Sequence, residues 1–168
     1  MIRICSLLVL LFILYSNANA ANLDELNSSA KAGDINAMHN LGIIYITGQD
    51  APQNYSEAMK WFEKAALQGQ HNSMYSLGIM HRLGEGVPID LSKAWAWYSL
   101  AAHFIPKDVD EWFIPRSKIE MYQRRPREIE PDLTKDDMMK AEILRAGLYK
   151  KIKSNLTLHS SRTSNGAP

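Results

Sequence analysis

The apolar residues of this chain recur at intervals of three and four, the spacing that places side chains on one face of a helix. One stripe comprises Ala37, Met38, Leu41, Ile44 and Tyr45, and a second comprises Ala58, Trp61, Phe62, Ala65 and Ala66. Between them, residues 48–54 carry glycine, proline and polar side chains, which favour a chain reversal. The pattern predicts two antiparallel helices joined by a short turn.

The same helix–turn–helix pattern returns 36 positions later, so that Gly33–Ala66 aligns with Gly69–Ala102. The aligned positions include Leu41-Gly42 with Leu77-Gly78, Trp61-Phe62 with Trp97-Tyr98, and Ala65-Ala66 with Ala101-Ala102. A period in the mid-thirties is typical of solenoids, in which each helix pair buries its apolar face only by stacking on a neighbour. We therefore expect a stacked all-α architecture.

Glycine and tryptophan positions refine this expectation. Gly42 and Gly78 lie in the middle of predicted helices, where glycine is unfavourable, so a close contact with another helix is expected to compensate. Trp61 and Trp97 occupy the repeating core position. Trp95 lies on another helical face, where it either covers the segment after the repeats or contacts a partner; we favour the cover.

The second unit carries the most specific motif of the chain. Residues 84–90 read Gly-Glu-Gly-Val-Pro-Ile-Asp, and Lys93-Ala94, Trp97-Tyr98 and Ala101-Ala102 follow. This order resembles the signature of Sel1-like repeats, relatives of the tetratricopeptide repeat. The first unit departs from it, with Asp50 for the second glycine and Ala51 for the valine. The resemblance implies a right-handed α/α solenoid with two full repeats within residues 21–102.

The segments that flank the repeats are less regular. Residues 23–32 align with the second helix of a unit and predict a leading half unit. Residues 103–133 are expected to form an irregular packing layer, with short helices that break near Pro115 and a loop held open by Pro126 and Pro131. Trp112 and Phe113 are expected to pack this layer onto the repeats. A capping helix is predicted over 134–153, and the polar residues 154–168 are expected to be a disordered tail.

Residues 1–20 have the pattern of a cleavable secretory signal peptide, with Arg3, an apolar run and the small residues Ala18 and Ala20. The alternative is an uncleaved anchor, but the apolar run is shorter than the roughly 20 residues that span a bilayer. We therefore expect an exported protein, periplasmic or secreted, with no stable membrane span after cleavage. The only cysteine, Cys5, lies in this segment, so the mature chain has no disulfide.

Charge and composition point away from several classes of function. The formal net charge is +1, which gives no long-range attraction to nucleic acid. The five histidines show no metal-ligand spacing, and no glycine-rich loop opens a helix after a strand. We therefore expect no metal and no cofactor.

By resemblance to tetratricopeptide-type repeats, a concave face formed by the first helix of each unit is expected to bind a protein or peptide partner. The residues assigned to it are Asn36, His39, Ile43, Ile46, Asn72, Tyr75, Ile79 and Arg82. Two alternatives remain open: Ile43 and Ile79 could pack on the neighbouring first helix, and Asn36 and Asn72 could serve the helix starts.

The sequence thus predicts a non-catalytic interaction or scaffold module, of unknown oligomeric state, in the cell envelope or outside the cell. One alternative is a β-lactam- or cell-wall-related hydrolase, because Ser28 and Lys31 match the Ser-x-x-Lys element of such enzymes, although the companion elements are missing. Another is a structural protomer of an envelope assembly that stacks through Trp95 and the irregular segment.

Overall fold

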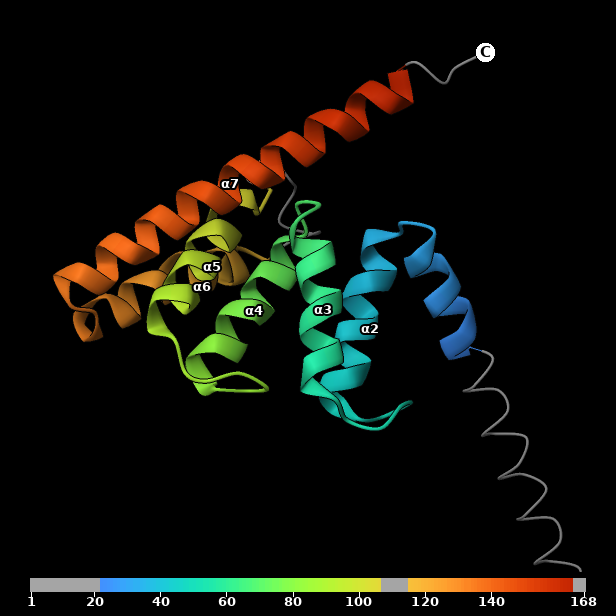
Figure 1. Cartoon of the computed structure of the whole chain (residues 1–168), viewed down its shortest axis with the longest axis horizontal. Helices are drawn as coiled ribbons and strands as arrows, with labels where there is room; N and C mark the ends of the chain where they lie inside the picture. The colour runs from blue at the N-terminus through green and yellow to red at the C-terminus, as the bar shows by residue number, and fades with distance from the viewer. Residues whose placement is uncertain (1–21, 107–114, 165–168) are drawn as a thin grey trace, which may run out of the picture.

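The computed structural model describes residues 22–106 and 115–164, which form a series of stacked helices (Figure 1). A helix over 22–31 comes first. The helices that follow are α2 (Ile35–Thr47), α3 (Tyr55–Ala66), α4 (His71–Leu83), α5 (Leu91–Phe104), α6 (Arg116–Ile129), the short 3-10 helix η1 (Glu130–Asp132) and α7 (Lys135–Ser164). The hairpins α2–α3 and α4–α5 are the two predicted units. The all-α solenoid of antiparallel helix pairs is confirmed.

The helix boundaries follow from side-chain caps and glycines. Asp34, Asn54 and Asp90 each accept a hydrogen bond from the backbone of the first turn that follows them, which satisfies amide groups with no partner inside the helix. At the other end, α2 and α4 both stop at a glycine with a left-handed backbone, Gly48 at φ 70° and Gly84 at φ 76°. Glycine adopts this conformation without the clash that a Cβ atom would cause. The two units therefore repeat in sequence and also in the way their helices are capped.

The two mid-helix glycines mark the closest helix contacts. A Cβ atom at Gly42 would lie 2.4 Å from a ring carbon of Phe62, and one at Gly78 would lie 2.5 Å from a ring carbon of Tyr98. Each unit therefore seats the aromatic ring of its second helix directly on the backbone of its first helix. This is the compensation expected from the sequence.

The core runs through both units and into the segments that follow. Its largest cluster joins fully buried side chains of α3, α4 and α5 to Tyr122 of α6 and Ile152 of α7. A second cluster holds Trp61 and the leading helix, whose Ala30 is buried, so the predicted half unit is present. Trp97 and Trp95 are also buried, and Trp95 donates to Glu130 at 3.1 Å. Trp95 therefore covers the segment after the repeats, as favoured.

The expected open loop around Pro126 is wrong, because Pro126 lies inside α6. Its missing N–H leaves one backbone carbonyl of the preceding turn without its usual partner. Burial of Tyr122, Pro126 and Ile129 on one face of α6 holds the helix together across this break. From Arg116 on, the segment expected to be irregular is thus a well-formed third stacking layer.

The predicted disorder from residue 154 is also wrong, because α7 continues to Ser164. Two contacts explain this: the Asn155 side chain donates to the Leu67 carbonyl at 2.9 Å, and the Leu156 side chain lies against Gly69. In Figure 1, α7 runs along the edge of the molecule from α5 and α6 towards the side of α3. The last helix therefore packs on the turn between the two units as well as on the second unit.

Residues 1–20, Trp112 and Phe113 lie outside the described part of the chain. Within the part that is described, no helix combines the length and the apolar character needed to cross a membrane.

Candidate protein-interaction surface

Of the four residues assigned to the concave face in the first unit, three contact other parts of the chain. Asn36 accepts a hydrogen bond from the Gln70 side chain at 3.1 Å, and His39 Nδ1 lies 2.9 Å from the Ser73 hydroxyl. The His39 ring also lies 5.4 Å from that of Phe62. Ile46 is half-buried against the large core cluster. Ile43 is 41% exposed, and Asn36 is exposed as well in spite of its hydrogen bond.

In the second unit, α6 occupies the position that the sequence assigned to a partner. The Tyr122 hydroxyl donates to the Asn72 side chain at 2.8 Å, and Arg125 Nε donates to the Tyr75 hydroxyl at 2.9 Å. The Tyr75 and Tyr122 rings lie 4.5 Å apart.

Ile79 packs on the cluster that contains Ile129, the last residue of α6. Ile79 is therefore partly buried within the chain and is not fully open to a partner. Asn72 and Tyr75 likewise form a contact between helices, because α6 stacks on α4 much as α4 stacks on α2.

Arg82, the last of the assigned residues, lies beside a buried tyrosine. Burial raises the pKa of the Tyr98 hydroxyl, and the nearby positive charges of Arg82 and Arg125 oppose that rise. Arg82 is itself partly exposed at the end of α4. Its charge remains within reach of a ligand at the rim of this face.

What stays open on the first unit is a single stripe, which we call the open face: Asn36, Asn40, Ile43 and Thr47 of α2. All four residues are exposed, and their spacing of four, three and four places them on one side of the helix. The equivalent stripe on α4 is largely covered by α6, and of its members only Leu83, 57% exposed, is fully open. Asn40, Thr47 and Leu83 were not assigned by sequence reasoning.

Two histidines lie behind the open face, where α2, α4 and α6 meet. Burial, together with the nearby charges of Lys118 and His39, lowers the pKa of His71 to about 4. Burial and Lys118 also lower the pKa of His39. Both rings are therefore neutral near pH 7, and the His71 ring packs edge-on against Tyr122 at 5.9 Å. Their environment suits packing between helices.

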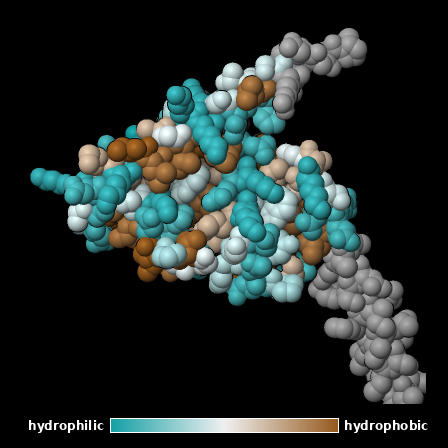
Figure 2. Space-filling model, in the orientation of Figure 1, coloured by the Kyte–Doolittle hydropathy of each residue, from teal (hydrophilic) through white to brown (hydrophobic). Residues whose placement is uncertain are grey.

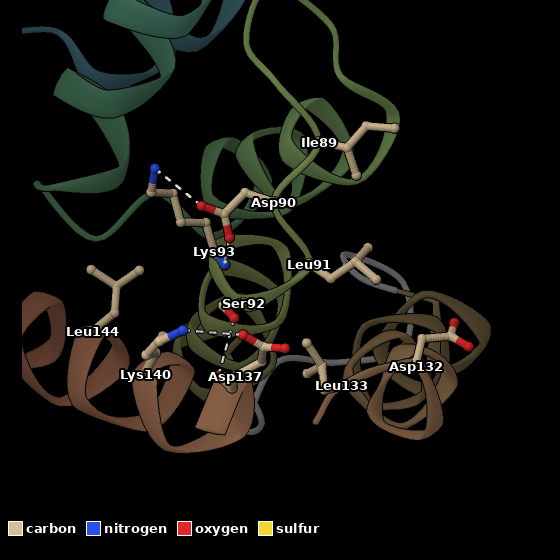
Figure 3. Close-up of a pocket in the computed structure, with 10 residues that line it drawn as sticks. All are labelled: Ile89, Asp90, Leu91, Ser92, Lys93, Asp132, Leu133, Asp137, Lys140 and Leu144. Carbon is tan, nitrogen blue, oxygen red and sulfur yellow. Dashed lines mark hydrogen bonds and ion pairs between the residues drawn. The ribbon is translucent and has the colours of Figure 1, made fainter. Parts of the chain in front are cut away.

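A pocket of about 610 Å³ lies between the turn that precedes α5 and the start of α7 (Figure 3). Its apolar lining is formed by Ile89, Leu91, Leu133 and Leu144. Four of the charged residues at its rim form ion pairs, Asp90 with Lys93 at 3.2 Å and Asp137 with Lys140 at 3.4 Å. Sequence reasoning missed this pocket because its two walls come from segments about forty residues apart.

The Ser-x-x-Lys element does not form a catalytic arrangement. The Ser28 hydroxyl donates to the Asp24 carbonyl of its own helix at 2.8 Å, and both Ser28 and Lys31 are exposed. A serine hydroxyl directed to a backbone carbonyl is not activated by a neighbouring base. Among the described residues, no group of three or more His, Cys, Asp or Glu side chains could hold a metal ion.

Comparison with known proteins identifies the class of the fold. Residues 35–70 and 71–103 each match the model of the Sel1 repeat. The two helix pairs of this chain are therefore two Sel1 repeats, and the resemblance seen in their motifs is confirmed. Sel1 repeats generally mediate protein–protein interaction.

Two solved structures extend the comparison. One is c5321, a protective antigen present in uropathogenic Escherichia coli strains that displays an SLR fold; it is 22% identical with a TM-score of 0.66, and the match covers 87% of this chain and 28% of c5321. The other is a Sel1 repeat protein from Oxalobacter formigenes, 23% identical with a TM-score of 0.45 over 72% of this chain and 97% of that one. The likeness to c5321 shows the fold, although this chain spans little more than a quarter of that protein. No curated protein matches the chain.

Proposed function

We propose that this protein is a non-catalytic scaffold that holds a peptide or protein partner on the open face, and that it does so in the cell envelope or outside the cell. The observation that supports this site is the contrast between the two units. The stripe on α4 is largely covered by α6, whereas the same stripe on α2 is exposed along its whole length. A stripe that the neighbouring helices leave exposed is a natural place for a partner in a repeat protein.

The chemistry of the open face suits an extended peptide or a partner helix. Ile43 offers an exposed apolar side chain between two amides, Asn36 and Asn40. Apolar contact supplies affinity, while amide groups can donate to and accept from a peptide backbone. The Thr47 hydroxyl donates to the Ile43 carbonyl at 3.0 Å, so it leaves mainly its methyl group for contact.

The test compares two surface substitutions in affinity capture from the native envelope and secreted fractions. Ile43→Asp places a charge in the open face, and Ile89→Asp places the same charge at the rim of the pocket. Both side chains are well exposed, Ile43 at 41% and Ile89 at 66%, so neither variant should lose much stability. We expect a partner retained by the wild type and by Ile89→Asp to be lost from Ile43→Asp.

The opposite result, loss with Ile89→Asp and retention with Ile43→Asp, would move the binding site to the pocket and contradict the open face. Thermal unfolding of each variant shows whether the loss reflects binding or folding.

Binding of a fluorescent penicillin provides a separate check on the non-catalytic assignment. We expect no covalent labelling, and labelling that disappears in Ser28→Ala would contradict that assignment.

Export is part of the proposal and is supported by the signal-like pattern of residues 1–20. Expression in a bacterial host followed by fractionation and N-terminal sequencing tests it. The expected product is found outside the cytoplasm and starts after Ala20. A full-length chain retained in the cytoplasm would contradict the proposed location while leaving the open face untouched.

A further inference from the structure

Helix α7 has a second ordered stripe, on the side away from the core. Its inner side carries the buried Ala141 and Ile152. On the opposite side lie Asp136, Met139, Ile143, Gly147 and Lys150, which we call the outer stripe of α7. Their spacing of three and four aligns them over about four turns.

The middle of the outer stripe is apolar and exposed. Met139 is 58% exposed and Ile143 is 67% exposed. Single exposed apolar residues are common on protein surfaces, but two on successive turns of one helix face form a continuous apolar strip. Figure 2 shows hydrophobic surface on the side of the molecule where the first half of α7 lies.

Gly147 is the third mid-helix glycine among the described residues, and it differs from the other two. A Cβ atom at Gly42 or Gly78 would collide with an aromatic ring, whereas one at Gly147 would meet nothing within 4 Å. Glycine in a helix interior is unfavourable relative to alanine, and inside this chain no contact compensates for it. The surface at Gly147 is therefore free to receive a side chain from another molecule.

We propose that two copies of this protein associate through the outer stripes of α7, packed antiparallel and centred on Ile143. In this register, residues equally distant from Ile143 face each other across the interface. Met139 then lies over Gly147 of the partner subunit, so that the longest apolar side chain of the stripe meets the position with no side chain. The twofold axis produces this contact twice.

Charge complementarity favours the same register. Asp136 then lies opposite Lys150 of the partner subunit, again on both sides of the axis. Within the chain, neither Asp136 nor Lys150 forms an ion pair among the residues that the structure describes. When a second copy of the stripe is reversed, its basic end meets the acidic end of the first copy, and its glycine meets Met139. The stripe therefore fits a second copy of this chain. The interface is separate from the open face, so each proposal can fail without the other.

The test is analytical ultracentrifugation of the full mature chain over a range of concentrations. We expect the wild type to show a concentration-dependent monomer–dimer equilibrium and Ile143→Asp to be monomeric. Asp136→Lys and Lys150→Asp should each weaken association by about tenfold or more, because each brings like charges together at two places. Circular dichroism confirms that each variant keeps its helical content.

Mixing the two charge variants is the most specific test of the proposed register. Asp136→Lys and Lys150→Asp chains repel themselves but form two opposite-charge pairs with each other, so we expect the mixture to dimerise at least as well as the wild type. Asp24→Lys and Lys31→Asp, on the leading helix, make the same changes in net charge and should not affect association. A wild type that stays monomeric up to about 1 mM would overturn the proposal. A dimer that is insensitive to Ile143→Asp, or charge variants that fail to rescue each other, would overturn it as well.

Discussion

At the scale of single residues, the glycines record which surfaces approach one another. Gly86 has a backbone φ of 77°, and a Cβ atom there would lie 2.6 Å from the Cβ of Tyr55 at the start of α3. The turn of the second unit therefore rests on the second helix of the first. In the first unit the equivalent residue, Asp50, lies beside Asn22 and Leu26 of the leading helix. Its departure from the repeat signature thus falls where the preceding helix belongs to the leading half unit.

Gly78→Ala is expected to destabilise the protein even though alanine favours helices. The added methyl group would lie 2.5 Å from the Tyr98 ring, which has no free space because Tyr98 is only 1% exposed. Overpacking of this kind lowers the free energy of unfolding by about 2 kcal/mol. Urea denaturation of dilute protein measures it.

Gly147→Ala provides the matched control, since its added methyl group meets nothing within 4 Å. There the helix propensity of alanine should raise the free energy of unfolding by about 0.5 to 1 kcal/mol. Equal effects of the two substitutions would contradict the assigned helix contact at Gly78.

His71 makes stability depend on pH in a defined direction. Its folded-state pKa of about 4 lies below its ordinary value of 6.5, so the unfolded chain binds the proton more readily than the folded chain does. This contribution to stability is complete above pH 6.5 and is lost as pH falls towards 4. We expect the urea midpoint to fall across this window in the wild type and to fall less in His71→Asn. A variant with the unchanged pH slope would show that folding does not lower the pKa of His71.

At the scale of elements, the sequence predicts the hairpins well because their signals are local. The signals lie within one or two turns of the helix boundaries that they determine. They are caps such as Asn54 and Asp90 and the apolar stripes around Trp61 and Trp97. The later helices depend on distant contacts. Pro126 stays inside α6 because its neighbours on the helix are buried, and that burial is invisible in the local sequence.

The candidate site shows the same division. The sequence assigns residues from Asn36 to Arg82 to one face expected to bind a partner, but the chain itself supplies α6 as the neighbour of Asn72 and Tyr75 on α4. No periodicity marks α6 as a stacking helix, because Tyr122 and Arg125 do not follow the repeat pattern. Their polar partners Asn72 and Tyr75 are 50 residues earlier in the chain.

Truncation after Ser154 tests the contacts made by the last turns of α7. It removes the Asn155 bond to the Leu67 carbonyl and the Leu156 contact with Gly69. One partly buried hydrogen bond and one half-exposed leucine together correspond to about 1 to 2 kcal/mol of stability. Truncation after Thr157 keeps both residues and should have a smaller effect in thermal unfolding. Equal melting temperatures for the wild type and the shorter chain would contradict a structural role for this segment.

At the scale of the whole molecule, α7 changes the connectivity of the array. In a simple solenoid each unit contacts only its sequence neighbours, so stability is a sum of local terms. Here α7 packs along α5 and also contacts the turn at Leu67, which follows the first unit. A single cooperative thermal transition is expected, with equal calorimetric and van't Hoff enthalpies. Two resolved transitions in the wild type would show that the units unfold separately.

The course of α7 also bears on how the molecule would respond to mechanical load. Hairpins stacked only end to end can be peeled off one at a time when the chain is pulled. The final helix of this protein lies across the second hairpin and reaches the end of the first, so tension applied near its carboxyl terminus must first detach that helix. The chain would therefore resist extension up to one threshold force and then yield over its length, a property suited to an anchor point that must hold a partner under strain.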